Sequence, residues 1–262
     1  MGYYGKPILK KPVWKVPDVP GYLFLGGMAG ASASLALGAQ IACHPELVRP
    51  ARIAAAVGSL ASVGALINDL GRPERFLNML RVFKVTSPLS VGSWILAPFS
   101  GLTALTAATD LSGRFGRIGT LSGAAAGVLG PAMCTYTSVL LADTAVPAWH
   151  QAYPELPFVF AGSAMTSAAG ASLLAASSKP AVRLGLIGSA MELGSSAAME
   201  RRVETYRSSR LLTAAKALTV AGAGLSLLRR SRVATVLAGA SYLAAGVCTR
   251  VGVYYSGMDS VR

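Results

Sequence analysis

The feature that most constrains this chain is a series of apolar runs long enough to cross a membrane. A helix needs roughly 20 residues to span a hydrocarbon core of about 30 Å. Helices satisfy their own backbone hydrogen bonds in lipid, and these runs are far too long for barrel strands. We therefore predict an all-α, polytopic membrane protein with eight transmembrane helices. The eight runs are 22–43, 52–70, 89–109, 118–142, 156–177, 181–199, 211–228 and 233–254.

The Lys and Arg residues lie almost entirely in the connections between the apolar runs. A formal net charge of +13 could by itself indicate a nucleic-acid-binding protein. Basic residues in connections are instead typical of membrane topology determinants, so we expect membrane lipids, and no nucleic acid, as partners. Eight crossings would place both termini on one side with the connections 71–88, 143–155 and 200–210. That side carries more Lys and Arg than the other, which predicts cytoplasmic termini.

The cysteines and histidines argue against a metal-containing cofactor in this chain. Cys43, Cys134 and Cys248 are far apart and form no CxxC or similar spacing, so we expect neither an iron–sulfur cluster nor a structural zinc site. His44 and His150 are expected on opposite sides of the membrane. They cannot share one iron, so we expect no haem held by two histidines and no metal.

Two ionisable residues fall inside apolar runs, where charges are costly and usually functional. Glu192 lies near the middle of the sixth run and Lys216 lies within the seventh. Counted from the same side of the membrane, both are roughly 8 to 12 Å deep at 1.5 Å per residue, so they could pair. The alternatives stay open: a proton path, an ion pair that only fixes helix packing, or a Lys216 side chain that extends toward the membrane surface.

Tyr136 and Asp143 are candidates for a quinone site. They lie seven residues apart at the end of the fourth run, which places them two turns apart on one helix face. A quinone needs a hydrogen-bond donor for a carbonyl and a route for protons. The alternative for Tyr136 is a buried tyrosine that only satisfies a backbone carbonyl.

The segment DLGRPERF (69–76) follows the second run and is rich in charge. Asp69 ends the helix, Gly71 breaks it, and Pro73 prevents its continuation. The remaining charged residues of the corner are Arg72, Glu74 and Arg75. We expect these side chains to interlock with Asp69 across a tight corner.

The longer segment NDLGRPERFLNMLRVFKVTSPLSVGSW (68–94) resembles the signature of the polysulfide reductase membrane-subunit family, also called NrfD-like. Weaker similarities occur along most of the chain, in YYGKPILKKPVW, LFLGGMAGASA, TYTSVLLADTAVPAWH, ELPFVFAGSA and TRVGVYYSG. Members of this family are quinone-reactive membrane partners of molybdopterin oxidoreductases. Together these motifs identify the chain as a member.

The resemblance implies an organisation for the whole chain. Residues 1–21 would lie on the partner-docking face, 22–142 and 156–254 would form two four-helix bundles, 143–155 would connect them, and 255–262 would form a tail. A ferredoxin-like iron–sulfur subunit would dock beside the charged corner and link the chain to a molybdenum or tungsten catalytic subunit. Menaquinone or a related quinone would bind non-covalently near the same face.

The resemblance also implies roles for single residues. Tyr136 matches the tyrosine of the fourth helix that is implicated in quinone binding in relatives. The Asn and His that begin the first helix of one relative are missing, because the sequence here reads PDVPGY, and Asp18 and Tyr22 are the candidates to replace them. Arg250 matches a basic residue typical of the final helix and is expected to fix a carboxylate.

These expectations lead to one function and two alternatives. We predict the quinone-reactive anchor subunit of a respiratory oxidoreductase in the cytoplasmic membrane of a bacterium or archaeon, inactive without its partners. Asp69, Asp143 and Glu192 are expected to handle protons. The alternatives are a purely structural anchor and a proton-translocating subunit that uses Glu192 and Lys216.

Overall fold

The computed structural model describes residues 12–72, 74–228 and 230–261, without the side chains of Arg75 and Phe76. The regular structure within these ranges is entirely helical, and six of the helices are long and apolar enough to cross a membrane. The chain is therefore an all-α, multi-pass membrane protein. The six helices are α1 (Asp18–Ile41), α2 (Pro45–Asp69), α4 (Pro88–Ser112), α5 (Gly116–Ala142), α7 (Leu156–Ala175) and α11 (Arg232–Asp259).

Two further long helices cover the sixth and seventh predicted runs. They are α8 (Lys179–Arg202) and α10 (Arg210–Leu227). α8 has charged residues at both ends and Glu192 between them, so it is less apolar than the other six. The crossing of the membrane by α8 and α10 stays a prediction. Three short helices occupy connections, namely α3 (Arg75–Met79), α6 (Pro147–Gln151) and α9 (Glu204–Arg207).

Local sequence explains where the helices begin and end. Four of them start after a serine whose hydroxyl accepts a hydrogen bond from the backbone N–H three residues later, which satisfies one of the free donors at a helix start. These serines are Ser87, Ser178, Ser209 and Ser231. The predicted break at Gly71 is confirmed, because α2 ends at Asp69 and Gly71 has φ +68°. Pro73 lies outside the described residues.

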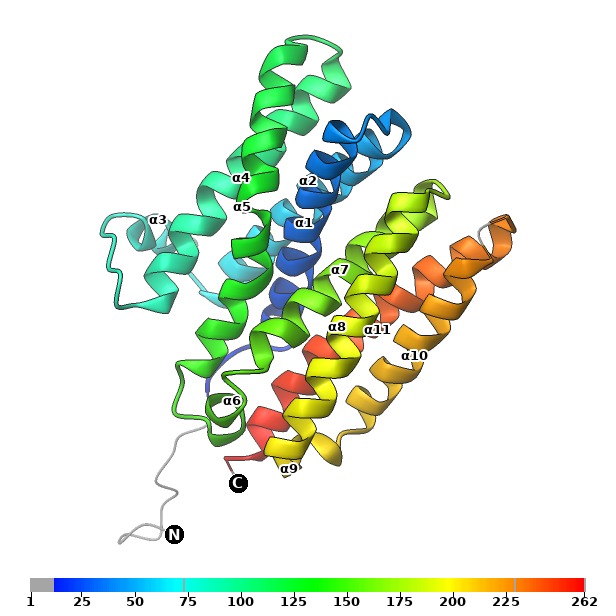
Figure 1. Cartoon of the computed structure of the whole chain (residues 1–262). Helices are drawn as coiled ribbons and strands as arrows, with labels where there is room; N and C mark the ends of the chain where they lie inside the picture. Colours follow the sequence, from blue (N-terminus) through cyan, green and yellow to red (C-terminus); the bar gives the residue numbers. More distant parts are fainter. Residues whose placement is uncertain (1–11, 73, 229, 262) are drawn as a thin grey trace, which may run out of the picture.

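The long helices pack as two groups that share a broad contact (Figure 1). In the first group, α1 and α4 each contact α2 and α5. In the second, α7 and α10 each contact α8 and α11. α1 also packs on α7 and α11, and α5 packs on α7. The division into two separate four-helix bundles therefore stays an interpretation.

The helices approach one another closely where small residues meet. Gly30 of α1 faces Gly130 of α5, and a Cβ added at Gly30 would lie 2.6 Å from the Gly130 carbonyl oxygen. A side chain at this position would push the two backbones apart. Close packing through small residues is typical of membrane helices, which gain little from apolar burial against lipid.

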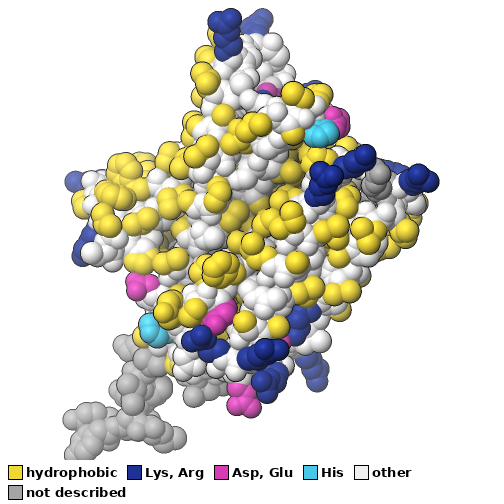
Figure 2. All heavy atoms as spheres, in the orientation of Figure 1, with side chains coloured by type: hydrophobic (Ala, Val, Ile, Leu, Met, Phe, Trp, Pro, Cys, Tyr) yellow, Lys and Arg dark blue, Asp and Glu magenta, His cyan; other side chains and the backbone are white. Residues whose placement is uncertain are grey.

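The connections divide the molecule into two ends. The start of α1, the end of α11, α3, α6 and α9 lie at one end, which we call the terminus end (Figure 1). The links α1–α2, α4–α5, α7–α8 and α10–α11 lie at the other, which we call the opposite end. On the face shown in Figure 2, charged side chains gather toward the ends and hydrophobic side chains cover much of the band between them. Such a band is the pattern expected where lipid surrounds the helices.

Candidate functional site

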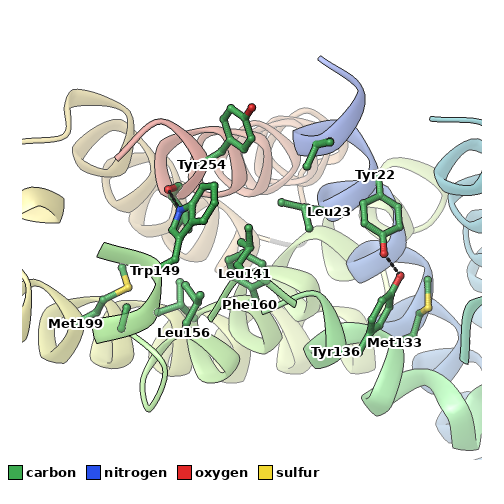
Figure 3. Close-up of a cluster of buried hydrophobic side chains, with 14 of the residues drawn as sticks. Tyr22, Leu23, Met133, Tyr136, Leu141, Trp149, Leu156, Phe160, Met199 and Tyr254 are labelled. Atoms are coloured by element: carbon green, nitrogen blue, oxygen red, sulfur yellow. Dashed lines mark hydrogen bonds between the residues drawn. The ribbon is translucent and has the colours of Figure 1, made fainter. Parts of the chain in front are cut away.

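Two buried tyrosines meet at the terminus end. Tyr22 lies in the second turn of α1 and Tyr136 lies near the end of α5, and their hydroxyl groups are hydrogen-bonded to each other (Figure 3). The rings are in an edge-to-face arrangement, with centroids 6.4 Å apart and planes at 69°. The sequence pointed to each residue separately, but it gave no sign that they form a pair. We call Tyr22 and Tyr136 the tyrosine pair.

α4 and α2 hold the tyrosine pair in place. A Cβ added at Gly92 of α4 would lie 2.7 Å from two ring carbons of Tyr136, so only glycine lets the helix approach the ring this closely. Ser62 of α2 donates a hydrogen bond to the backbone oxygen of Tyr22 at 3.2 Å. The narrow cavity beside the pair is bordered by Met79 and Leu89 among others and has a volume of about 10 Å³, which is room for about one water.

The tyrosine pair can donate a proton to a ligand. Each phenol carries one O–H and can also accept hydrogen bonds. The bond between the two hydroxyls uses one of the two protons, so the other stays available. A carbonyl oxygen placed against the pair would therefore find a donor in otherwise apolar surroundings, where a hydrogen bond is strong.

Two of the predicted acids attach the N-terminal segment to α2. The Asp18 carboxylate accepts a hydrogen bond from Asn68 Nδ2 at 2.8 Å, and Asp69 accepts one from the backbone N–H of Lys15 at 2.9 Å. Lys15 Nζ also donates to the backbone oxygen of Asn68 at 3.1 Å. Asp18 lies one helical turn from Tyr22, so this attachment borders the tyrosine pair.

Asp143 lies at the terminus end, directly after α5. It follows α5 as the C-terminal cap residue, two turns beyond Tyr136, and its side chain is exposed. In this exposed position the carboxylate can be solvated by water and needs no buried partner. Its role toward a quinone or protons stays a prediction.

The predicted interlock of the charged corner with Asp69 is wrong for the side chains that the structure describes. Asp69 bonds to Lys15, while Arg72 and Glu74 are exposed. The Arg75 side chain lies outside the described residues. The N-terminal segment lies against the end of α2 and takes the place that the interlock would need. The expected contact of this corner with a partner stays a prediction.

A second polar site surrounds Glu192 in the middle of α8. This carboxylate is 2% exposed. It accepts hydrogen bonds from Thr249 at 2.7 Å, Thr166 at 3.3 Å and Thr219 at 3.4 Å. The threonines come from α11, α7 and α10, so one acid joins four helices. The sequence indicated Glu192 but not its three donors.

Arg250 is buried beside this cluster. Its guanidinium lies 3.7 Å from the centre of the Phe160 ring, and Nη2 donates to the backbone oxygen of Phe160 at 2.9 Å. Within the described part of the chain, Nε and Nη1 have no hydrogen-bond partner. Arg250 and Glu192 do not form one of the ion pairs within 4 Å found in the described part of the chain. The role expected for Arg250, fixing a carboxylate, stays a prediction with Glu192 as the candidate.

Lys216 does not pair with Glu192, so the predicted pairing is wrong. Its Nζ donates to both carboxylate oxygens of Glu200 at 2.8 Å. Glu200 lies eight residues beyond Glu192 on α8, about 12 Å closer to the terminus end. The long side chain of Lys216 reaches toward that end, as the alternative of an extended lysine predicted. The expected place of Lys216 on a proton path stays a prediction.

The histidines lie at opposite ends, as the sequence predicted. His44 precedes α2 at the opposite end, and His150 belongs to α6 at the terminus end, where Nδ1 lies 3.0 Å from the backbone oxygen of Ala142. The described residues contain no group of three His, Cys, Asp or Glu side chains that could hold a metal ion.

A comparison with protein families identifies the family of the chain. The family model described as polysulphide reductase, NrfD, matches residues 8–181. The matched residues include the tyrosine pair and the charged corner, and they end at the start of α8. Glu192, Lys216 and Arg250 lie outside the match. No curated protein matches the chain at a significant level.

Proposed function

Because the chain belongs to the polysulphide reductase NrfD family, we propose that it is the quinone-reactive membrane subunit of a respiratory oxidoreductase complex. The tyrosine pair, which lies inside the matched residues and is buried at the terminus end, is the observation that carries this proposal. We place the quinone, a menaquinone or a relative, against Tyr136. The complex lies in the cytoplasmic membrane of a bacterium or archaeon, with the termini in the cytoplasm.

The donor chemistry of the tyrosine pair suits a quinone carbonyl. A bound quinone accepts or releases electrons and protons at its ring oxygens. Tyr136 and Tyr22 would hold one ring oxygen by a hydrogen bond and supply the proton at that position, because the pair has one O–H to spare. The cavity of about 10 Å³ is smaller than a ring, so Met79 and Leu89 at its border must move when a ring enters.

Carboxylates at the terminus end are suited to move protons to and from the tyrosine pair. Asp18 lies one turn from Tyr22, and Asp143 lies two turns from Tyr136 at the exposed end of α5. Asp69 lies beside Asp18 at the end of α2, since Asn68 bonds to Asp18. This end is therefore proposed to exchange protons with the aqueous phase.

The terminus end also offers a surface for an electron-carrying partner. The connection around α3 exposes Leu77 and Phe83 together with Arg72 and Lys84. We propose that a ferredoxin-like iron–sulfur subunit docks here and connects the chain to a molybdenum or tungsten catalytic subunit. Exposed apolar side chains among basic ones suit such a contact.

A purely structural anchor is the first alternative. The narrow cavity beside Tyr136 favours it, since no ring-sized space exists there without movement of side chains. Under this alternative the tyrosine pair only joins α1 to α5. Exchange of Tyr136 would then change helix packing but not quinone chemistry.

A proton-translocating subunit is the second alternative, favoured by the buried Glu192 cluster. An acid inside the membrane is costly to bury, so an acid with three hydroxyl donors from three helices is a candidate for a functional residue. The cluster lies outside the matched residues, so the family match adds nothing to this alternative.

The exchange Tyr136→Phe tests the proposal. It removes the hydroxyl and keeps the ring, so the purified complex should assemble normally while quinone turnover falls on the order of 100-fold, the lower range for loss of a proton donor. Tyr242→Phe is the matched control, because Tyr242 is also buried and hydrogen-bonded but lies in α11. Equal turnover in the two variants would support the anchor instead.

A further inference from the structure

We propose that the chain binds one anionic phospholipid in a crevice at the opposite end. This crevice is a cavity of about 540 Å³ between the two helix groups, bordered by α1, α5, α7 and α8. Its volume falls within the range of ligand pockets, about 300 to 1,000 Å³. The crevice lies apart from the tyrosine pair, and the proposal does not depend on quinone reactivity.

The walls of the crevice suit one acyl chain. α1 and its C-terminal cap residue contribute residues from Ala31 to Ala42, a length of about 16 Å at 1.5 Å per residue. Half of a hydrocarbon core is about 15 Å thick, so the crevice extends through roughly one leaflet. Met165, Leu184 and Ile187 form apolar parts of the wall. An acyl chain that enters from the surface would be surrounded by hydrocarbon to its end.

Positive charge gathers where the crevice opens at the opposite end. Arg183 borders the cavity, and Lys179 precedes it by four residues on the same side of α8. His44 also borders the cavity, with Glu46 beside it at 3.1 Å. Figure 2 shows Lys or Arg side chains and a His side chain close together near this end, above hydrophobic side chains. Arg183 and Lys179 carry two positive charges and Glu46 carries one negative charge, so the opening of the crevice has a net positive charge.

This combination of charge and shape selects a phospholipid with an anionic head group. A phosphate at the membrane surface can contact Arg183 and Lys179 while its acyl chain fills the apolar walls. A quinone offers no anionic group to these cations. A zwitterionic lipid fits the walls, but it gains less from the cations because its head group has no net charge.

Binding can be counted by native mass spectrometry. The full chain, with the subunits that co-purify, is stripped of lipid and titrated with phosphatidylglycerol or phosphatidylcholine. We expect one phosphatidylglycerol per chain, bound more tightly than phosphatidylcholine. Arg183→Gln should weaken phosphatidylglycerol binding about fivefold, the effect of one basic residue near an anionic lipid surface. Arg117→Gln, which removes an exposed cation from the same end but not from the crevice, should leave binding unchanged.

A second pair of variants tests the crevice itself. Gly38 borders the cavity, and a Cβ added there would meet nothing within 4 Å. Gly38→Phe should therefore fill the space without disturbing the helix and abolish binding of the lipid. Gly101→Phe is the matched control, since a Cβ at Gly101 of α4 also meets open space but lies outside the crevice.

Three results would overturn the proposal. The first is equal phosphatidylglycerol binding by the Gly38→Phe and Gly101→Phe variants. The second is equal affinity of the unmodified chain for the two lipids. The third is an equal effect of Arg183→Gln and Arg117→Gln on phosphatidylglycerol binding. Each of these concerns lipid binding alone, so it leaves the proposed quinone site untouched.

Discussion

At the residue scale, hydrogen bonding in apolar surroundings decides what each polar side chain can do. Tyr22 and Tyr136 satisfy each other, and Glu192 is satisfied by threonines from three helices. The sequence pointed to these residues because a phenol or carboxylate inside an apolar run is costly to bury and usually has a function. It did not point to Thr249, because threonines are common in such runs and bond to their own helix, as Thr249 also does with Ala245 at 3.0 Å.

The partner of Lys216 could not be chosen from the sequence. Glu192 and Glu200 lie on the same helix, about 12 Å apart along its axis, and the lysine side chain can extend in either direction. Because three threonines donate hydrogen bonds to Glu192, this carboxylate does not need a lysine as a hydrogen-bond donor. Only the packing of α10 on α8 shows that Glu200 is the partner.

The Glu192 and Arg250 charges should be coupled in stability. Arg250→Met removes a buried cation near Glu192, and we expect the free energy of unfolding in lipid-detergent micelles to fall by about 1 kcal/mol through the lost coupling. Adding Glu192→Gln removes the uncompensated charge and should restore part of this loss. The combination of Glu192→Gln with Arg52→Met, whose partner is Asp110, should be additive. Additivity in both combinations would contradict the coupling.

At the element scale, the long helices follow from the sequence more directly than the short ones. The apolar runs predict where the long helices lie. Prolines mark the first turn of several of them, and the glycine after α2 marks the end of that helix. α6 is different, because its five residues cannot form a stable helix alone. It is held by Trp149, which donates to the backbone oxygen of Val253 at 2.8 Å, and by Tyr206, which donates to that of Ala148 at 3.1 Å (Figure 3 shows the first contact). These partners are distant in sequence, so local patterns could not predict them.

The close approach of α4 to α5 should matter for quinone turnover. Gly92→Ala places a methyl group where the Tyr136 ring now lies, so the ring must shift. Because small misplacements of a reacting group are costly, turnover should fall on the order of tenfold to 100-fold. Gly101→Ala on the same helix meets open space and should keep full turnover. Equal steady-state rates for the two variants would show that the position of the ring is unimportant.

At the scale of the whole molecule, the sequence predicted an all-helical membrane protein, which is confirmed. The arrangement of the helix groups could not be derived in the same way. Small residues are spread through all the runs, and they allow many close contacts without selecting one. In the structure, α1 and α7 each pack on helices of both groups. The sidedness of the protein also stays a prediction, because charge counts in the connections give only a preference.

Labelling of cysteines with an impermeant maleimide tests whether α8 crosses the membrane. Cys43 is exposed at the opposite end, and Ser208→Cys in a Cys43→Ser background places a thiol after α9 at the terminus end. If α8 crosses the membrane and the termini are cytoplasmic, intact cells should label Cys43, and Ser208→Cys should react only after permeabilisation. Labelling of both positions from the same side would contradict the topology.

The central claim is that a quinone binds against the tyrosine pair, and photoaffinity labelling with an azido-quinone tests it most directly. The purified complex is illuminated with the probe, and peptide mass spectrometry identifies the labelled segments. The account predicts labelling at the terminus end of α1, α4 and α5, in the segments around Tyr22, Gly92 and Tyr136, and competition by unlabelled menaquinone. Labelling confined to α8 and α10, or labelling that menaquinone does not reduce, would contradict it.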